Sequence, residues 1–116
     1  MTLPIGVATP VAKRFGGGKT QGATLISASG DNTIATPATG KRLTLYWIFL
    51  SSSQDNANEV LAIVKLGARV VYECYLGSPG AFAHWEPVTA DAEGGALIVN
   101  LSGAGSVAVN YTITEV

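Results

Sequence analysis

The sequence predicts an all-β protein: an antiparallel, jelly-roll-like β-sandwich of about eight strands that follows an extended N-terminal arm. From residue 21 onward, short runs of β-branched and aromatic residues alternate with Gly, Asn, Asp, Ser and Pro, a pattern typical of strands joined by turns. These runs recur about every 10 to 12 residues without the crossover helices that a parallel sheet needs. The 116 residues fit one domain, which we divide into an arm (1–20) and a sandwich (21–116).

Composition predicts the arm. Residues 1–20 contain Pro4, Pro10 and three consecutive glycines at 16–18, which leave no clean run for a strand or a helix. Apolar residues still recur at odd positions, as in a strand that adds to the edge of another sheet. The alternative is a mobile tail with no role. We favour docking because five apolar side chains are costly to leave in water, namely Leu3, Ile5, Val7, Val11 and Phe15.

The first three strands are expected at residues 23–28, 33–36 and 41–50. A turn at 29–32 separates the first two, and Pro37 ends the second because proline cannot donate to a ladder. The third strand is the most apolar. Strict alternation divides its side chains into Leu43, Leu45, Trp47 and Phe49 on one face and Tyr46, Ile48 and Leu50 on the other. Both faces are then apolar, which predicts a central strand covered on both sides.

A hairpin is expected next, with strands at residues 59–66 and 69–76 and a turn at Gly67 and Ala68. Residues 59–66 would tolerate a helix, but three β-branched residues within eight, closed by glycine, favour a strand. Residues 82–89 form a strand interrupted by Pro87, which predicts a sheet edge.

The last two strands are expected at residues 96–101 and 107–116, joined by a segment rich in glycine and serine. The final strand alternates cleanly. Its inward side chains are predicted to be Val107, Val109, Tyr111 and Ile113, with Ala108, Asn110, Thr112 and Thr114 facing water or a partner.

Charge is sparse and unevenly placed. Charged residues make up 13% of the chain, about half of what is usual, which suggests that a partner covers part of the surface. The first 42 residues hold five basic residues against one acid, a net +4, and the remainder holds two against seven, a net −5. A basic arm on an acidic body could dock on an acidic neighbour, including another copy of the chain, through Lys13, Arg14, Phe15 and Lys19. The basic residues are too dilute for a nucleic-acid site, and no apolar run reaches the roughly 18 residues of a membrane span.

The search for catalytic and cofactor motifs predicts neither an enzyme nor a bound cofactor or metal. The segment GGGKT at residues 16–20 resembles a phosphate loop, but Lys13 stands where the motif needs its first glycine. His84 is the only histidine, which excludes a metal site built on several histidines and leaves one base for any nucleophile. Cys74 is the only cysteine, so no disulfide can form within the chain.

Aromatic residues raise a second possibility for binding, since exposed rings on a sandwich can stack on sugars. Most of them are expected in the core. The exception is a group beside a loop rich in Gly and Pro, formed by Phe82, His84 and Trp85, which we take as a possible surface contact.

Three stretches, residues 36–45 (TPATGKRLTL), 94–102 (GGALIVNLS) and 107–116 (VAVNYTITEV), resemble small β-sandwich virion structural proteins of tailed bacteriophages. In that group a Gly-Lys-Arg turn commonly begins a long apolar strand, and a glycine-punctuated hairpin commonly ends the chain. The resemblance covers about residues 21–116. This chain departs from the group in the polar loop at 51–58 and in its long basic arm.

The resemblance implies a capsid decoration, or cement, protein that binds the phage head and stabilises its shell, often as a homotrimer. The implied partners are the major capsid protein and other copies of the chain, and the implied location is the capsid surface of a virion made in the host cytoplasm. It carries over no catalytic residue. The alternatives are a receptor-binding or carbohydrate-binding β-sandwich of a phage tail, and a minor tail or head-completion protein.

Overall fold

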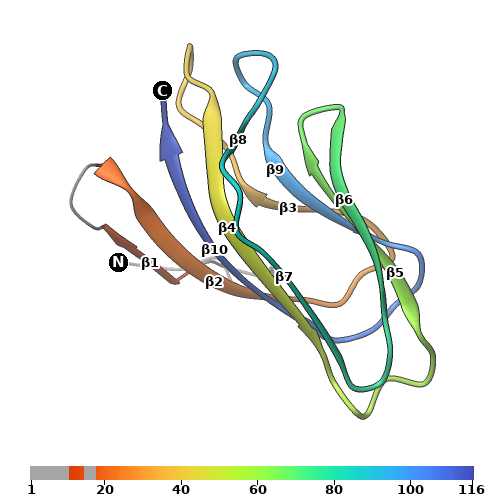
Figure 1. The fold of residues 1–116 in the computed structure, drawn as a ribbon. Coiled ribbons are helices and arrows are strands. Elements are labelled where there is room, and N and C mark those ends of the chain that lie inside the picture. The colour runs from red at the N-terminus through yellow and green to blue at the C-terminus, as the bar shows by residue number, and fades with distance from the viewer. Residues whose placement is uncertain (1–10, 15–17) are drawn as a thin grey trace.

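The computed structural model describes residues 18–116 and the backbone of residues 11–14. These residues form ten strands in two antiparallel sheets that pack face to face, so the predicted all-β sandwich is confirmed (Figure 1). In chain order the strands are β1 (Val11–Arg14), β2 (Thr20–Ile26), β3 (Gly30–Ala35), β4 (Leu43–Ser52), β5 (Val60–Leu66), β6 (Arg69–Leu76), β7 (Gly80–His84), β8 (Val88–Thr89), β9 (Leu97–Leu101) and β10 (Val107–Glu115).

The strand order is that of a jelly roll. Sheet A runs β1-β2-β10-β4-β7, with β8 also paired to β4, and sheet B runs β3-β9-β5-β6. Without the short strands β1 and β8, two four-stranded sheets remain, and the chain passes between them after β2, β3, β4, β6, β7 and β9. Double-sheet jelly rolls of eight strands have this organisation. The eight expected strands therefore correspond to β2–β10, with β7 and β8 sharing one predicted segment.

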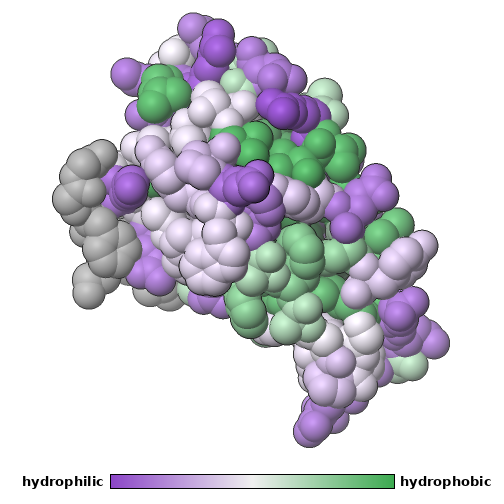
Figure 2. Space-filling view, viewed as in Figure 1, coloured by the Kyte–Doolittle hydropathy of each residue, from purple (hydrophilic) through white to green (hydrophobic). Residues whose placement is uncertain are grey.

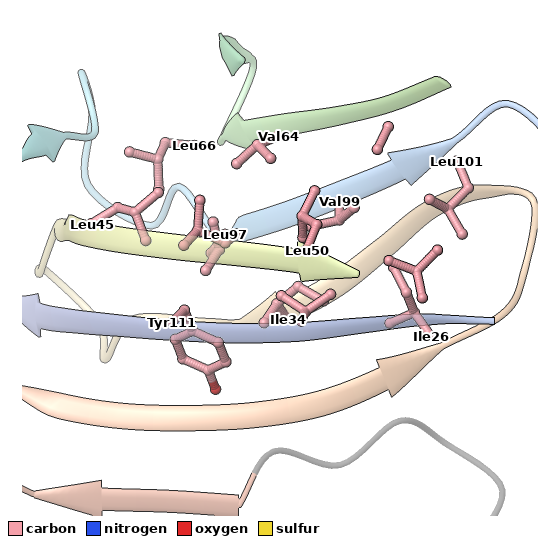
Figure 3. Close-up of a cluster of buried hydrophobic side chains, with 14 of the residues drawn as sticks. Ile26, Ile34, Leu45, Leu50, Val64, Leu66, Leu97, Val99, Leu101 and Tyr111 are labelled. Atoms are coloured by element: carbon pink, nitrogen blue, oxygen red, sulfur yellow. The ribbon is translucent and has the colours of Figure 1, made fainter. Parts of the chain in front are cut away.

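The core lies between the two sheets and consists of aliphatic side chains from both (Figure 3). Strands β5 and β9 alternate strictly between buried and half-buried residues, as period-two patterning requires. The predicted inward residues of β10 are all buried, because they face sheet B, but Thr112, which was predicted to face water or a partner, is also buried. The most completely buried aliphatic residues include Leu45, Leu50, Val64, Leu97, Val99 and Leu101, each fully enclosed.

Among the described residues, Tyr111 is the one aromatic residue that is buried within this otherwise aliphatic core, and Gly22 makes room for it. The two residues are direct cross-strand partners on β10 and β2. A Cβ atom on Gly22 would lie 2.2 Å from Cζ and 2.3 Å from the phenolic oxygen of Tyr111. The ring therefore occupies the space that any side chain at position 22 would fill. Burial raises the pKa of the Tyr111 phenol.

Strand β4 contains a β-bulge that the alternation of its sequence does not reveal. Thr112 pairs with Trp47 and the next residue, Ile113, pairs with Leu45, so Tyr46 has no partner in β10. The extra residue reverses the alternation. Leu45, Ile48 and Leu50 consequently point inward, whereas Phe49 is 37% exposed. The prediction that Trp47 and Phe49 share a face with Leu43 and Leu45 is wrong. The predicted central position of β4 is confirmed, because β4 lies between β10 and β7, but its outer side is only partly covered, since Phe49 is exposed.

Two further expectations are corrected along the chain. Part of the predicted arm is a strand, because Val11–Arg14 pairs antiparallel with β2 as the edge of sheet A, whereas residues 1–10 and 15–17 lie outside the described residues. The segment 82–89 is two strands instead of one, since the chain leaves the ladder after His84 and rejoins β4 at Val88. The predicted edge position of this segment is confirmed.

Loops at one end of the sandwich are tied together by Asn56. Its side-chain amide donates to the Ser106 carbonyl oxygen (3.0 Å) and its amide oxygen accepts from the Ser106 backbone N–H (2.7 Å). The backbone N–H of Ser53 donates to the same Ser106 carbonyl oxygen. The polar loop between β4 and β5 (residues 53–59), which begins two residues later than predicted, is thus held against the β9–β10 connection.

Candidate interaction site

The broadest candidate site is the side of sheet A that faces away from sheet B. Cross-strand register arranges its residues in four rows: Leu25-Ala108-Ser51-Ala81, Ala23-Asn110-Phe49-Ala83, Gln21-Thr112-Trp47, and Thr114-Thr44-Thr89. Each row alternates with a row of buried residues that point into the core. We call these fourteen residues the outer face of sheet A.

No residue of the outer face of sheet A is charged. Most are small, and two of them, Thr44 and Thr112, are buried, whereas Leu25 is a large apolar residue and is 60% exposed. Figure 2 shows green and pale residues across the middle of the molecule, where β4, β7 and β10 run, and much of the purple towards its ends. The acids lie elsewhere: Asp31 on β3, Glu73 on β6, Glu115 at the end of β10, and Asp55, Glu59, Glu86, Asp91 and Glu93 between strands.

The backbone of two predicted arm residues, Lys13 and Arg14, lies beside this face. Lys13 and Arg14 belong to β1, where Lys13 pairs with Gln21 and Arg14 pairs with Thr20. The ammonium group of Lys19 lies 4.3 Å from the ring centroid of Tyr46, within the range of a cation–π contact. Phe15 lies outside the described residues, as do Leu3, Ile5 and Val7. The structure thus places the backbone of two basic residues along the edge of the outer face of sheet A.

The predicted group of Phe82, His84 and Trp85 is divided between two environments. Phe82 and His84 pair with the buried residues Leu50 and Ile48, which directs both side chains towards the core. There they meet Tyr72 from the edge strand of sheet B. The Tyr72 ring lies 5.7 Å from Phe82 and 3.6 Å from His84 between centroids, and its hydroxyl is hydrogen-bonded to Nε2 of His84.

These three rings fill the gap between the edge strands β6 and β7, so Phe82 and His84 hold the two sheets together at this edge. Tyr72 was not anticipated as their partner. No sequence pattern relates residues of opposite sheets, because their contact depends on the completed fold.

Trp85 takes the opposite direction and is 70% exposed. Its ring lies 5.9 Å from that of Trp47 at an interplanar angle of 33°. The two indoles therefore form an aromatic platform at the corner of the outer face of sheet A. Of the three predicted contact residues, Trp85 alone keeps a mostly exposed side chain.

The outer side of sheet B has a different, charged character. Asp31 accepts a hydrogen bond from the side-chain amide of Asn100 (2.7 Å) and forms an ion pair with Lys65 (3.0 Å). The hydrogen bond from Asn100, followed by that from Lys65, lowers the pKa of the Asp31 carboxyl below its ordinary value. Sheet B therefore presents fixed charges to solvent, whereas the fourteen residues of the outer face of sheet A are uncharged.

Within residues 11–14 and 18–116, no three His, Cys, Asp or Glu side chains lie close enough together to hold a metal ion. Burial raises the pKa of the Cys74 thiol, which keeps it protonated at neutral pH and weakens it as a nucleophile. Over the same residues, no helix has the length and apolar character needed to cross a membrane.

Comparisons with known proteins give only a distant likeness of fold. No protein-family model matches the sequence, and no curated protein matches it. Among solved structures, the cupin domain of Cnp3 from Schizosaccharomyces pombe is similar, with a TM-score of 0.44 and 11% sequence identity. The match covers 98% of this chain and 63% of that chain, so this chain spans less than two thirds of its neighbour. A likeness this distant carries no information about binding or activity.

Proposed function

We propose that the protein is a structural component of a bacteriophage virion, a decoration or cement protein that binds the head surface and stabilises the shell. The observation that carries the proposal is the placement of a basic strand, β1, at the edge of an uncharged sheet face. A protein that lies on a shell needs a broad surface for contact with other subunits more than it needs a cleft. The resemblance of residues 36–45, 94–102 and 107–116 to phage virion proteins supports the same role.

The proposed partner is the major capsid protein, through an acidic part of its outer surface. Lys13 and Arg14 are consecutive residues of β1, and Lys19 follows within the same basic segment. The body of the protein is acidic, so these residues would lead the approach to an acidic shell. The contact is then electrostatic in part and weakens as salt screens it. The proposal includes no enzymatic activity, cofactor, nucleic acid or membrane.

The test is co-sedimentation with heads assembled from the major capsid protein of the same genome. Lys13→Glu/Arg14→Glu reverses two adjacent charges in β1, and Lys41→Glu/Arg42→Glu reverses two adjacent, exposed charges in the β3–β4 loop as a matched control. We expect wild-type protein and the control to bind in low salt and the β1 variant to lose binding at least tenfold. Absence of wild-type binding would refute the proposed function, and equal losses in both variants would refute the role of β1.

Copy number in purified virions separates decoration from the tail and head-completion alternatives. Quantitative mass spectrometry should find as many copies as there are repeating positions on the shell. A handful of copies per virion would instead indicate a tail or connector position and would contradict decoration.

The aromatic platform favours carbohydrate recognition as the second candidate function. Exposed tryptophan rings can stack on the apolar faces of sugars, and Trp85 and Trp47 present two adjacent rings. A glycan array distinguishes the candidates, because a decoration protein should bind no sugar. Binding that disappears in Trp85→Ala would support the second candidate.

A further inference from the structure

We infer that residues 1–10 of one copy add as an extra strand to the free edge of β6 in a second copy. This contact is separate from the proposed head contact, which uses Lys13 and Arg14 of β1, and it does not depend on head binding. It gives the apolar half of the arm a partner that the basic half does not need.

Among the edge strands of the two described sheets, β6 is the longest and the least protected. Its eight residues include no proline and no lysine, and on its outer side Val70 is 47% exposed and Tyr75 is 70% exposed. The other edges carry features that discourage a further strand: β1 is basic, β3 is interrupted by a bulge, and the β7–β8 edge is broken before Pro87. Because sheets usually blunt their edges in these ways, an unprotected edge indicates a place for strand addition.

The free edge of β6 presents the main-chain groups of alternate residues. The backbone N–H of Ser102 donates to the carbonyl oxygen of Leu61, so Leu61 bonds to β9 and not to β6. Its partner in β6, Tyr75, therefore belongs to a pair without ladder hydrogen bonds, and so does Glu73, because such pairs alternate along an antiparallel ladder. The N–H and C=O groups of Tyr75 and Glu73 consequently point away from β5, where an added strand can bond to them.

The sequence of residues 1–10 suits a strand that bonds along one side. Its large aliphatic residues, Leu3, Ile5 and Val7, have odd numbers, and Pro4 has an even number. In an extended chain the N–H groups of odd and even residues point in opposite directions, so a strand that pairs through its odd residues keeps Pro4 on its free side. Directly opposed residues project to the same side of a sheet, so the three aliphatic side chains would join Tyr75 on the outer side of sheet B. Residues 1–10 include no charged side chain, so none of them repels the acid at position 73.

The length of the arm requires the β6 edge of a second copy. Strands β1 and β6 lie at opposite sides of the sandwich, and β6 lies beside β7 (Figure 1). From β1 to β7 there are four strand spacings of about 4.8 Å, or about 19 Å in all. At roughly 3.3 Å per residue, about six of the ten residues would be used in crossing this distance. The remaining four are too few to place Leu3 to Val7 along the chain's own β6.

The chain's own β2 cannot accept this segment either. Val11 pairs with Ala23, and β2 ends three residues later at Ile26. Residues 8–10 would fill that remaining edge and leave Leu3 to Val7 beyond its end. A second copy therefore supplies the partner strand. Because the arm and the β6 edge are different surfaces, the contact is heterologous, and such contacts close into rings when the rotation between copies permits. The homotrimer that the virion resemblance implies is one such ring.

Size-exclusion chromatography with light scattering, on the full chain over a wide range of concentrations, tests the contact with a pair of proline variants. Ile5→Pro removes an N–H group that faces β6, whereas Gly6→Pro removes one that faces away and is the matched control. We expect oligomers for the wild type and for Gly6→Pro, and a rise of at least about tenfold in the dissociation constant for Ile5→Pro. Circular dichroism establishes that each variant is folded.

Cys74 allows a direct measurement of the pairing. It is the only cysteine, and it pairs with the buried Ala62, so its side chain lies on the inner side of β6. A cysteine introduced at Gly6 or Ala8 would lie on the same side, and one introduced at Val7 would lie on the opposite side. Mild oxidation should therefore link copies of Gly6→Cys or Ala8→Cys through Cys74 and leave Val7→Cys unlinked. Cys74→Ser in the same background should abolish these links.

Four results would overturn the inference: a wild type that stays monomeric at the highest concentration, equal effects of the two proline variants, links that form as readily through Val7→Cys as through Gly6→Cys, and links that persist in Cys74→Ser. Head binding fails or succeeds independently. An oligomer that does not bind heads refutes the proposed function and leaves the arm contact intact, whereas a monomer that binds heads does the reverse.

Discussion

Substitution of Gly22 by alanine should destabilise the protein through the ring of Tyr111. The new Cβ would lie 2.2 Å from Cζ, whereas ordinary contacts begin at 3.4 Å, so the ring must retreat by 3.4 − 2.2, or about 1.2 Å. Tyr111 is only 2% exposed, and close-packed interiors leave little room for a ring to move. Overpacking of this kind costs about 1–3 kcal/mol.

The net loss of stability in Gly22→Ala should be smaller than the cost of displacing the Tyr111 ring. Replacing glycine by alanine within a strand recovers about 0.5–1 kcal/mol of backbone entropy. Taking the upper end of the strain, we expect a net loss of about 2 kcal/mol in the free energy of unfolding. At roughly 4 °C per kcal/mol for a chain of this size, the melting temperature should fall by about 8 °C.

Urea unfolding followed by tryptophan fluorescence measures this loss, with Trp47 and Trp85 as reporters. Gly103→Ala is the matched control, because a Cβ at Gly103 meets no atom within 4 Å. The double variant Gly22→Ala/Tyr111→Leu should lose less stability than the sum of its single changes, since the clash is relieved. Equal stability of Gly22→Ala and Gly103→Ala would refute the packing explanation, and full additivity would show that Tyr111 is not the cause.

Two further predictions concern the polar contacts. Asn56→Ala removes both side-chain hydrogen bonds to Ser106 and should lower the free energy of unfolding, measured in urea, by about 1–3 kcal/mol. Asn58→Ala, in the same loop, is the control and should change the stability little, because the Asn58 side chain is exposed. Equal losses of stability in the two variants would contradict the anchoring role of Asn56. Asp31→Asn should destabilise the protein at pH 7 and progressively less in acid. The folded pKa of Asp31 lies below its ordinary value of 3.8, so its contribution is present above 3.8 and disappears as pH falls through the folded pKa. A wild-type advantage that is the same at pH 7 and in strong acid would contradict this linkage.

Much of the fold was predictable because most strands alternate cleanly. Strands β5, β9 and β10 each carry apolar residues at every second position, and burial follows this pattern except at Thr112 of β10, which is also buried. Turns rich in glycine and proline marked most boundaries to within a few residues. Strand β1 was missed because its four residues lie between Pro10 and a run of glycines, so its existence depends on pairing with β2.

The candidate site was less predictable, because it depends on the side of the sheet to which each side chain points. Phe82, His84 and Trp85 are close in sequence, but residues 82 and 84 share one side of a strand and residue 85 does not. Parity alone could have separated Trp85 from the other two. The stacking of Trp85 on Trp47 could not have been predicted, because the bulge at Tyr46 reverses the side on which Trp47 lies.

The bulge in β4 shifts the alternation of inward and outward side chains by one residue. On each side of Tyr46 the alternation of β4 is regular. The inward residues are the odd-numbered Leu43 and Leu45 before it and the even-numbered Ile48 and Leu50 after it. If the alternation is assumed to be unbroken along the whole strand, inward apolar residues are assigned to both sides. A strand with one buried side then resembles a strand with two. For long apolar strands, an analysis of side-chain alternation should therefore allow for one bulge. It can then distinguish a strand covered on both sides from one that keeps aromatic rings on its outer side.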